Sequence, residues 1–129
     1  MAWFAGLLAA ALLILAYVFL LHRRRVRLSP ALLGGLRREW ERAVGQQDPV
    51  RMLLEAEKVF EHLLTLWRFQ GTFADKLRSA GPRFQNVENL WQAHKLRNRI
   101  AHESGFQPSP EECQRAVRAF EEALRIVLH

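Results

Sequence analysis

Arg97, Asn98 and His102 are the residues of this chain whose types and spacing could do chemistry. On a helical wheel Arg97 and Asn98 fall inside the apolar arc formed by residues 87–102. A guanidinium on an apolar face costs several kcal/mol unless a carboxylate or a phosphate meets it. Arg97 therefore indicates either a structural ion pair or an anion-binding site. His102 lies one turn beyond Asn98, close enough to share that pocket.

Two carboxylates that could meet Arg97 lie on the helix predicted for residues 49–69. Glu57 and Glu61 border the apolar arc of that helix, but helix phase alone does not fix which of them faces Arg97. His94 points inward, and we interpret it as a hydrogen-bonded core residue. Glu57, Glu61 and His94 are the binding residues of the candidate site. No Cys or carboxylate stands at metal-binding spacing near His94, so we expect neither a metal nor a cofactor.

The pattern Arg97-Asn98-x-x-x-His102 resembles the Arg-x(4–6)-His signature of the HEPN superfamily, small helical bundles of which many are metal-independent ribonucleases. The resemblance covers roughly the last two-thirds of the chain and includes the helical order and the Ala101-His102-Glu103 ending. It implies that Arg97 stabilises charge on a scissile phosphate, that His102 is the general acid or base, and that Asn98 orients one of them. It also implies RNA or a nucleotide as ligand, and a homodimer in which two motifs face one cleft.

Two classes of function remain open. The first is a membrane-anchored HEPN-like domain that cleaves RNA or binds RNA or a nucleotide. The second is a non-catalytic, membrane-tethered structural or protein-interaction module whose protein partner the sequence does not identify. In that module Arg97, Asn98 and His102 form a buried polar network with Glu57 or Glu61. The direction of the Arg97 side chain, into an open cleft or into a closed ion pair, distinguishes them.

The net charge of +6 lies mostly near the amino end. Residues 1–47 hold seven Arg and Lys against two acidic residues, whereas residues 48–129 hold twelve against eleven. A basic face spread over the domain is therefore not expected, and the high pI is poor evidence for RNA binding. The single Cys113 excludes an internal disulfide and fits a reducing compartment.

Residues 2–21 form an apolar run without a charged side chain. About 20 helical residues match a hydrocarbon core of roughly 30 Å, which predicts a transmembrane helix. The basic run His22-Arg23-Arg24-Arg25 follows it, so we expect a single-pass protein of the cell membrane with the amino terminus outside and the domain in the cytoplasm. A cleaved signal sequence would need a basic region before the run and a small-residue cleavage site after it, and neither is present. A buried core helix is the other alternative, but such a helix is rarely apolar all round.

Capping residues divide the rest of the chain into helices. Helix-start signals occur at Ser29-Pro30, Asp48-Pro49, Thr72, Asn86 and Ser109-Pro110. They predict helices over residues 31–45, 49–69, 86–103 and 110–128, with a short connecting helix over 73–79. Gly71 is expected to end the second of these helices. Whether residues 31–45 are the first bundle helix or a semi-independent stalk is left open.

The predicted fold is all-α, with an N-terminal transmembrane helix followed by a small antiparallel helical bundle. The predicted divisions are an anchor at 1–22, a basic juxtamembrane segment with a short helix at 23–47, and a HEPN-like bundle at 48–129. Apolar residues at helical spacing define the expected core faces. They are Leu32, Leu36, Trp40 and Val44; Met52, Leu53, Ala56, Val59, Phe60, Leu63, Leu64 and Trp67; and Cys113, Ala116, Val117, Phe120, Leu124 and Val127.

Overall fold

The structure is a computed structural model that describes residues 2–23 and 26–128, and the described residues contain helices and no strand. The helices are α1 (Ala2–Arg23), α2 (Pro30–Val44), α3 (Pro49–Leu66), α4 (Phe73–Ala80), the short 3₁₀ helix η1 (Gly81–Arg83), α5 (Val87–His102) and α6 (Pro110–Leu124). The predicted all-α fold, an N-terminal apolar helix followed by a helical bundle, is confirmed.

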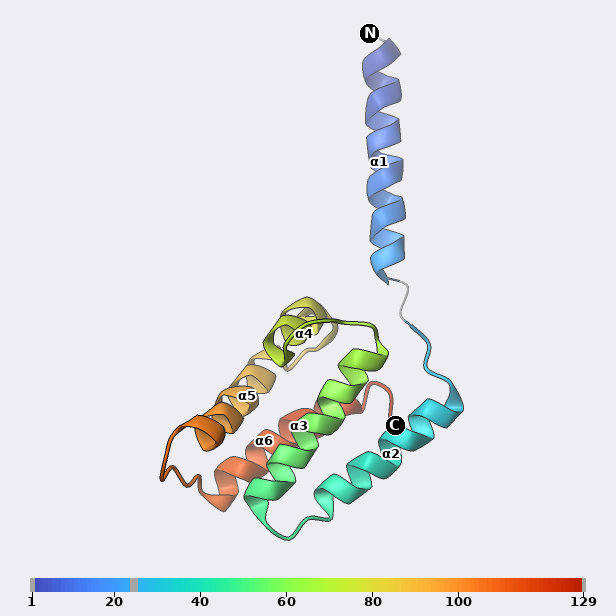
Figure 1. The fold of residues 1–129 in the computed structure, drawn as a ribbon. Coiled ribbons are helices and arrows are strands. Elements are labelled where there is room, and N and C mark those ends of the chain that lie inside the picture. Colours follow the sequence, from blue (N-terminus) through green and yellow to red (C-terminus); the bar gives the residue numbers. More distant parts are fainter. Residues whose placement is uncertain (1, 24–25, 129) are drawn as a thin grey trace.

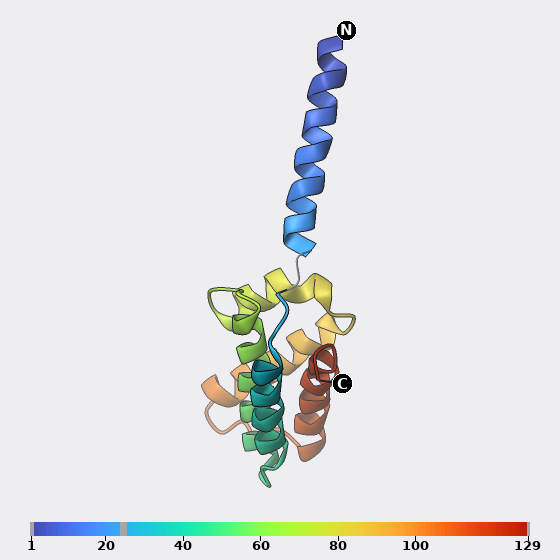
Figure 2. The same ribbon diagram turned by 90° about the vertical axis from the view of Figure 1, so that its right-hand side faces the viewer.

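Helix α3 is the central helix of the bundle, because it packs along α2 on one side and along α6 on the other. Helix α5 packs along the far side of α6, and α4 crosses the end of the bundle nearest to α1 (Figures 1 and 2). Helix α5, which carries Arg97 and Asn98, therefore lies at an edge of the bundle, with α3 on its inner side.

Aromatic rings fill the centre of the core. Phe60 on α3 is fully buried, and its ring centroid lies 5.9 Å from Phe73, 5.3 Å from Phe84 and 5.4 Å from Phe120. Every predicted core residue of α3 except the half-buried Met52 is buried. These rings join α3, α4 and α6 into one core, since offset and tilted aromatic pairs are favourable at such distances.

Helix α2 belongs to the bundle, because Leu36 is fully buried and Ala43 is nearly so. The predicted inner face is only partly right. Leu32 and Val44 are exposed, at 43% and 37%, whereas Leu36 faces α3 and Trp40 is half-buried. The reason is that α2 sits at the outside of the bundle, so only a narrow stripe of it meets a neighbour.

Side-chain caps begin the helices where the sequence predicted. Ser29, Asp48, Thr72 and Ser109 each accept a hydrogen bond from a backbone N–H in the first turn of the helix that follows. Asn86 stands at the N-cap position of α5, but its side chain instead donates to the carbonyl of Ala119, at 3.0 Å. That bond ties the start of α5 to α6, and such a long-range partner could not be seen in the local sequence.

The predicted helix ends were less accurate. Helix α3 ends at Leu66 and not at Phe69, because Arg68 adopts a left-handed conformation with φ 68°. The N–H of Phe69 donates to the carbonyl of Leu64 at 3.1 Å, which is the Schellman arrangement, and Gly71 lies further along the loop. The left-handed region costs a non-glycine residue about 1–2 kcal/mol. Helix α6 likewise ends at Leu124, four residues before the predicted end.

Helix α1 contains the candidate membrane span. Residues Ala2–Leu21 have a mean hydropathy of 2.7, and none of the span is buried against the rest of the molecule. It is the sole helix among the described residues long and apolar enough to cross a membrane, although a signal sequence can have the same length and composition. Its full exposure excludes a place in the core of this bundle.

Candidate functional site

Glu57 is the centre of a polar contact between α3 and α5, and it is the single charged or polar residue buried among those described, at 5% exposure. Its Oε1 lies 3.3 Å from Arg97 Nε, and its Oε2 lies 3.2 Å from His94 Nδ1. Both oxygens of one buried carboxylate thus have a partner on α5. We call Glu57, His94, Arg97 and Asn98 the α3–α5 junction.

Aromatic rings hold His94 in place. Its ring stacks on Phe73 of α4, with centroids 4.3 Å apart and planes 21° apart, and Trp91 meets it edge-on at 6.3 Å. His94 Nε2 lies 3.2 Å from Asn98 Nδ2. An amide nitrogen can only donate, so Nε2 accepts, and in a neutral ring Nδ1 then carries the proton and donates to Glu57.

The ion pair between Glu57 and Arg97 is buried at one end and open at the other. The Glu57 side chain is 7% exposed, whereas the Arg97 side chain is 37% exposed. A carboxylate in that position needs a compensating donor, while a guanidinium at the rim keeps part of its hydration. Arg97 therefore neutralises Glu57 while more than a third of its own side chain stays exposed to solvent.

Glu61, the other carboxylate predicted as a partner of Arg97, contacts a different cation. Its Oε1 accepts a hydrogen bond from Lys76 Nζ at 3.0 Å, and the same nitrogen donates to Thr65 at 3.1 Å. Glu61 lies one turn closer to the end of α3, where α4 crosses and α5 does not. Position along the axis, which the helical wheel ignores, decides between the two carboxylates.

His102 does not join the α3–α5 junction. It is exposed at the last position of α5, and it forms no hydrogen bond or ion pair with any residue that the structure describes. It follows Arg97 by five positions, which is about 140° around an α-helix, so the two side chains leave α5 in different directions. Asn98, on the His102 side of the helix, bonds to His94 instead.

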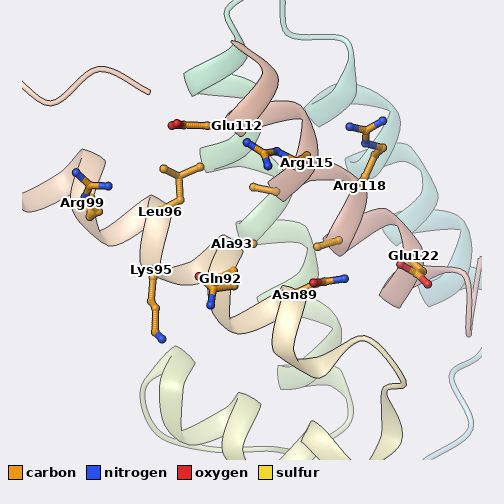
Figure 3. A pocket seen from close by; sticks show the side chains of 12 residues that line it. Asn89, Gln92, Ala93, Lys95, Leu96, Arg99, Glu112, Arg115, Arg118 and Glu122 are labelled. Atoms are coloured by element: carbon orange, nitrogen blue, oxygen red, sulfur yellow. The ribbon is translucent and has the colours of Figure 1, made fainter. Parts of the chain in front are cut away.

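The sequence reasoning missed two features of this region. Phe73 was assigned to a connector, yet its ring covers His94; the only local signal was an aromatic residue directly after the Thr72 cap. The other is a groove of about 780 Å³ on the opposite face of α5, between α5 and α6 (Figure 3). Its charged lining residues are Lys95, Arg99, Glu112, Arg115, Arg118 and Glu122.

The groove between α5 and α6 is lined by both apolar and charged side chains, and its cations are only partly neutralised. Arg99 bonds to Glu103 at 3.3 Å and lies over the ring of Phe106, 3.9 Å from its centroid. Neither Arg115 nor Arg118 forms an ion pair with a described residue. No group of three or more His, Cys, Asp or Glu side chains in the described residues could hold a metal ion.

No family model, curated protein or solved structure matches this chain. The resemblance of residues 97–102 to the HEPN signature therefore stays a prediction.

Proposed function

We propose that this chain is a membrane-tethered helical module without catalytic activity, in which Arg97 joins α5 to α3. The observation that supports this proposal is the ion pair between Arg97 and the buried Glu57 carboxylate, in which Nε lies 3.3 Å from Oε1. A guanidinium committed to a buried carboxylate is less free to meet a phosphate, because leaving Glu57 unpaired costs free energy. The separation of His102 from Arg97 supports the same conclusion.

The tether in this proposal is α1. Its length, its hydropathy and the absence of buried residues in it fit a bilayer span, and the basic residues after it favour a cytoplasmic bundle. Protease treatment of intact cells tests the orientation: the carboxyl end should stay protected until the membrane is opened. Digestion of the bundle from outside, or recovery of a soluble chain that starts after residue 21, would contradict the assignment.

A second candidate function is metal-independent cleavage of RNA, as the HEPN resemblance implies. The observation in its favour is that Arg97 is 37% exposed and His102 is exposed one turn beyond Asn98, so both side chains are accessible from solvent. A reaction between these groups would need the motifs of two chains to face each other, and a homodimer is part of this candidate.

One assay separates the two functions. The full chain in detergent micelles is incubated with mixed single-stranded RNA and a metal chelator, alongside its Arg97→Ala and His102→Ala variants, and the melting curve of each protein is recorded. The non-catalytic module predicts no cleavage by any of the three, a lower melting temperature for Arg97→Ala, and little change for His102→Ala.

The ribonuclease predicts the opposite pattern of effects. The wild type then cleaves RNA in the presence of chelator, and both variants lose about 10²-fold or more of the activity, because a general acid or a charge stabiliser has been removed. Loss of cleavage in a His102→Ala protein that melts like the wild type would overturn our proposal, because unfolding could not explain it.

A further inference from the structure

The chain between the span and the bundle is too short to let the bundle move far from the membrane. Two residues separate Arg23, the last residue of α1, from Val26, so their Cα atoms lie within about 11 Å of each other. Val26 and Leu28 already pack against the core. If α1 spans the bilayer, as in the function proposed above, the end of the bundle that carries Val26 must lie close to the lipid headgroups.

The topology decides which residues share that end. Both views show α4 and η1 across the end of the bundle nearest to α1, and the end of α3 and the start of α2 are also directed towards α1 (Figures 1 and 2). The segments concerned are residues 26–34, 66–88 and 121–128. We call them the α4 end.

The α4 end is more basic than the opposite end of the bundle. It contains six Arg and Lys against four acidic residues, whereas the opposite end, residues 41–51 and 99–115, contains four against five. The cations of the α4 end are Arg27, Arg68, Lys76, Arg78, Arg83 and Arg125. Three further arginines, at positions 23–25, join the α4 end to α1, so the positive charge is continuous along the sequence at this boundary.

Arg68 gives an independent reason to assign a role to this surface. It is the sole non-glycine residue with a positive φ among those described, and it is exposed. Glycine is the usual residue at that position of a Schellman motif, so an arginine there lowers the stability of the fold relative to glycine. Its neighbours Trp67 and Phe69 pack in or against the core, and each has the Arg83 guanidinium 5.0 Å from its ring centroid.

We propose that the α4 end is a docking surface for anionic lipid headgroups, with the exposed Arg68 as one of its contacts. The tether holds this end at the depth of the headgroups, and its excess of cations is complementary to an anionic leaflet. The tether removes most of the entropic cost of meeting the surface, because the bundle is already held beside it. The bundle therefore rests against an anionic bilayer with α4 towards the lipid.

The test uses the full chain reconstituted in vesicles, with a fluorophore on a cysteine introduced at one of two exposed positions. Gln70→Cys places the label on the α4 end, and Gln107→Cys places it on the opposite end. Cys113 is buried and should not react. Vesicles of phosphatidylcholine are compared with vesicles that also contain phosphatidylglycerol, each with a spin label on a fraction of the headgroups to quench nearby fluorescence.

Docking predicts stronger quenching at position 70 in the anionic vesicles than in the neutral ones, a difference that high salt removes. Position 107 should show no such difference. Each arginine near the surface contributes a factor of roughly five to the docking equilibrium, so Arg68→Gly should weaken the anionic preference by about that factor. The same variant should melt at a higher temperature than the wild type, because glycine relieves the left-handed strain.

Matched variants exclude a general effect of charge or of unfolding. Arg68→Lys keeps the charge and should keep the preference, and Arg51→Gln removes one exposed cation from the opposite end and should leave the preference unchanged. A variant that melts higher and docks less cannot be explained by loss of structure.

Alkaline carbonate extraction of the same vesicles tests the span separately. If the chain is released, α1 is not an integral anchor, and both the tether and the docking surface are wrong. If the chain is retained but position 70 is quenched equally in both lipids, or Arg68→Gly leaves the preference intact, the docking surface alone is overturned and the tethered module stands.

Discussion

Helix α3 contacts α6 and α5 by different physical means. Against α6 it buries apolar side chains around Phe60 and Phe120, both fully buried. Towards α5 it presents one carboxylate, Glu57, which forms a hydrogen bond with His94 and an ion pair with Arg97. Apolar contact stabilises in proportion to area and tolerates small shifts, whereas a buried ion pair has to be matched in position and in charge. The first contact supplies most of the stability, and the second fixes where α5 lies along α3.

The largest effect should come from breaking the apolar contact. Phe60→Ala removes a ring that contacts three other aromatic rings, and we expect a loss of about 3–5 kcal/mol in the free energy of unfolding. Leu32→Ala is the control, because Leu32 is 43% exposed and should cost about 1 kcal/mol or less. Chemical denaturation followed by helical circular dichroism measures both. Equal losses would show that the core is not centred on Phe60.

Breaking the ion pair should cost less. Arg97→Met removes the charge and keeps most of the volume, which leaves Glu57 with His94 as its one remaining partner, and we expect a loss of about 1–3 kcal/mol after allowance for the exposure of Arg97. Lys76→Met is the matched control. Its partner Glu61 is 37% exposed and can be hydrated, so this variant should lose less free energy of unfolding than Arg97→Met.

The same pair offers a stricter test of its polar character. Adding Glu57→Leu to Arg97→Met removes the unpaired carboxylate, so the double variant should recover much of the loss. A double variant less stable than Arg97→Met alone would mean that Glu57 contributes through contacts other than Arg97. Urea denaturation of the three proteins side by side gives the comparison.

The apolar contact also contains a group that titrates, and its effect should be smaller. Burial, together with the carboxylates of Glu112 and Asp48, raises the pKa of the Cys113 thiol above its ordinary value of 9.0. A thiol whose folded pKa is raised stabilises the fold below the unfolded pKa, and this contribution is lost as the pH rises through the folded value. Melting curves above pH 9.0 should therefore fall more steeply for the wild type than for Cys113→Ala.

The smallest effect should be at His102. Because it is exposed and contacts neither Glu57 nor Arg97, His102→Ala should change the free energy of unfolding by less than about 0.5 kcal/mol. A larger loss of stability in a thermal melt would show that His102 takes part in the polar contact between α3 and α5 after all.

Local rules were sufficient for the helix starts and insufficient for the helix ends. Ser29, Asp48, Thr72 and Ser109 cap the helices that follow them, because a cap depends on residues within one turn. The end of α3 depends instead on a left-handed Arg68, a conformation that residue type argues against. Glycine at position 71 suggested a later end than the chain adopts.

The candidate site was predictable as a set of residues but not as a set of contacts. The inward phase of Arg97 and His94 was visible on the helical wheel, and a carboxylate partner from α3 could be anticipated. Glu57 and Glu61 differ by one turn, and only the crossing of α4 and α5 over α3 decides that the first meets Arg97 and the second meets Lys76. His102 could have been separated from Arg97 by the angle between them on the helix.

The polar contact between α3 and α5 also affects how the molecule opens. When two apolar surfaces separate, exposing them to water costs free energy that no new hydrogen bond offsets. When α5 moves away from α3, by contrast, water can at once hydrate Glu57 and Arg97. Separating α5 from α3 therefore costs less free energy than separating α6 from α3, and amide hydrogens of α5 should exchange with solvent through a local fluctuation. Those of α3 should exchange only when the whole bundle unfolds.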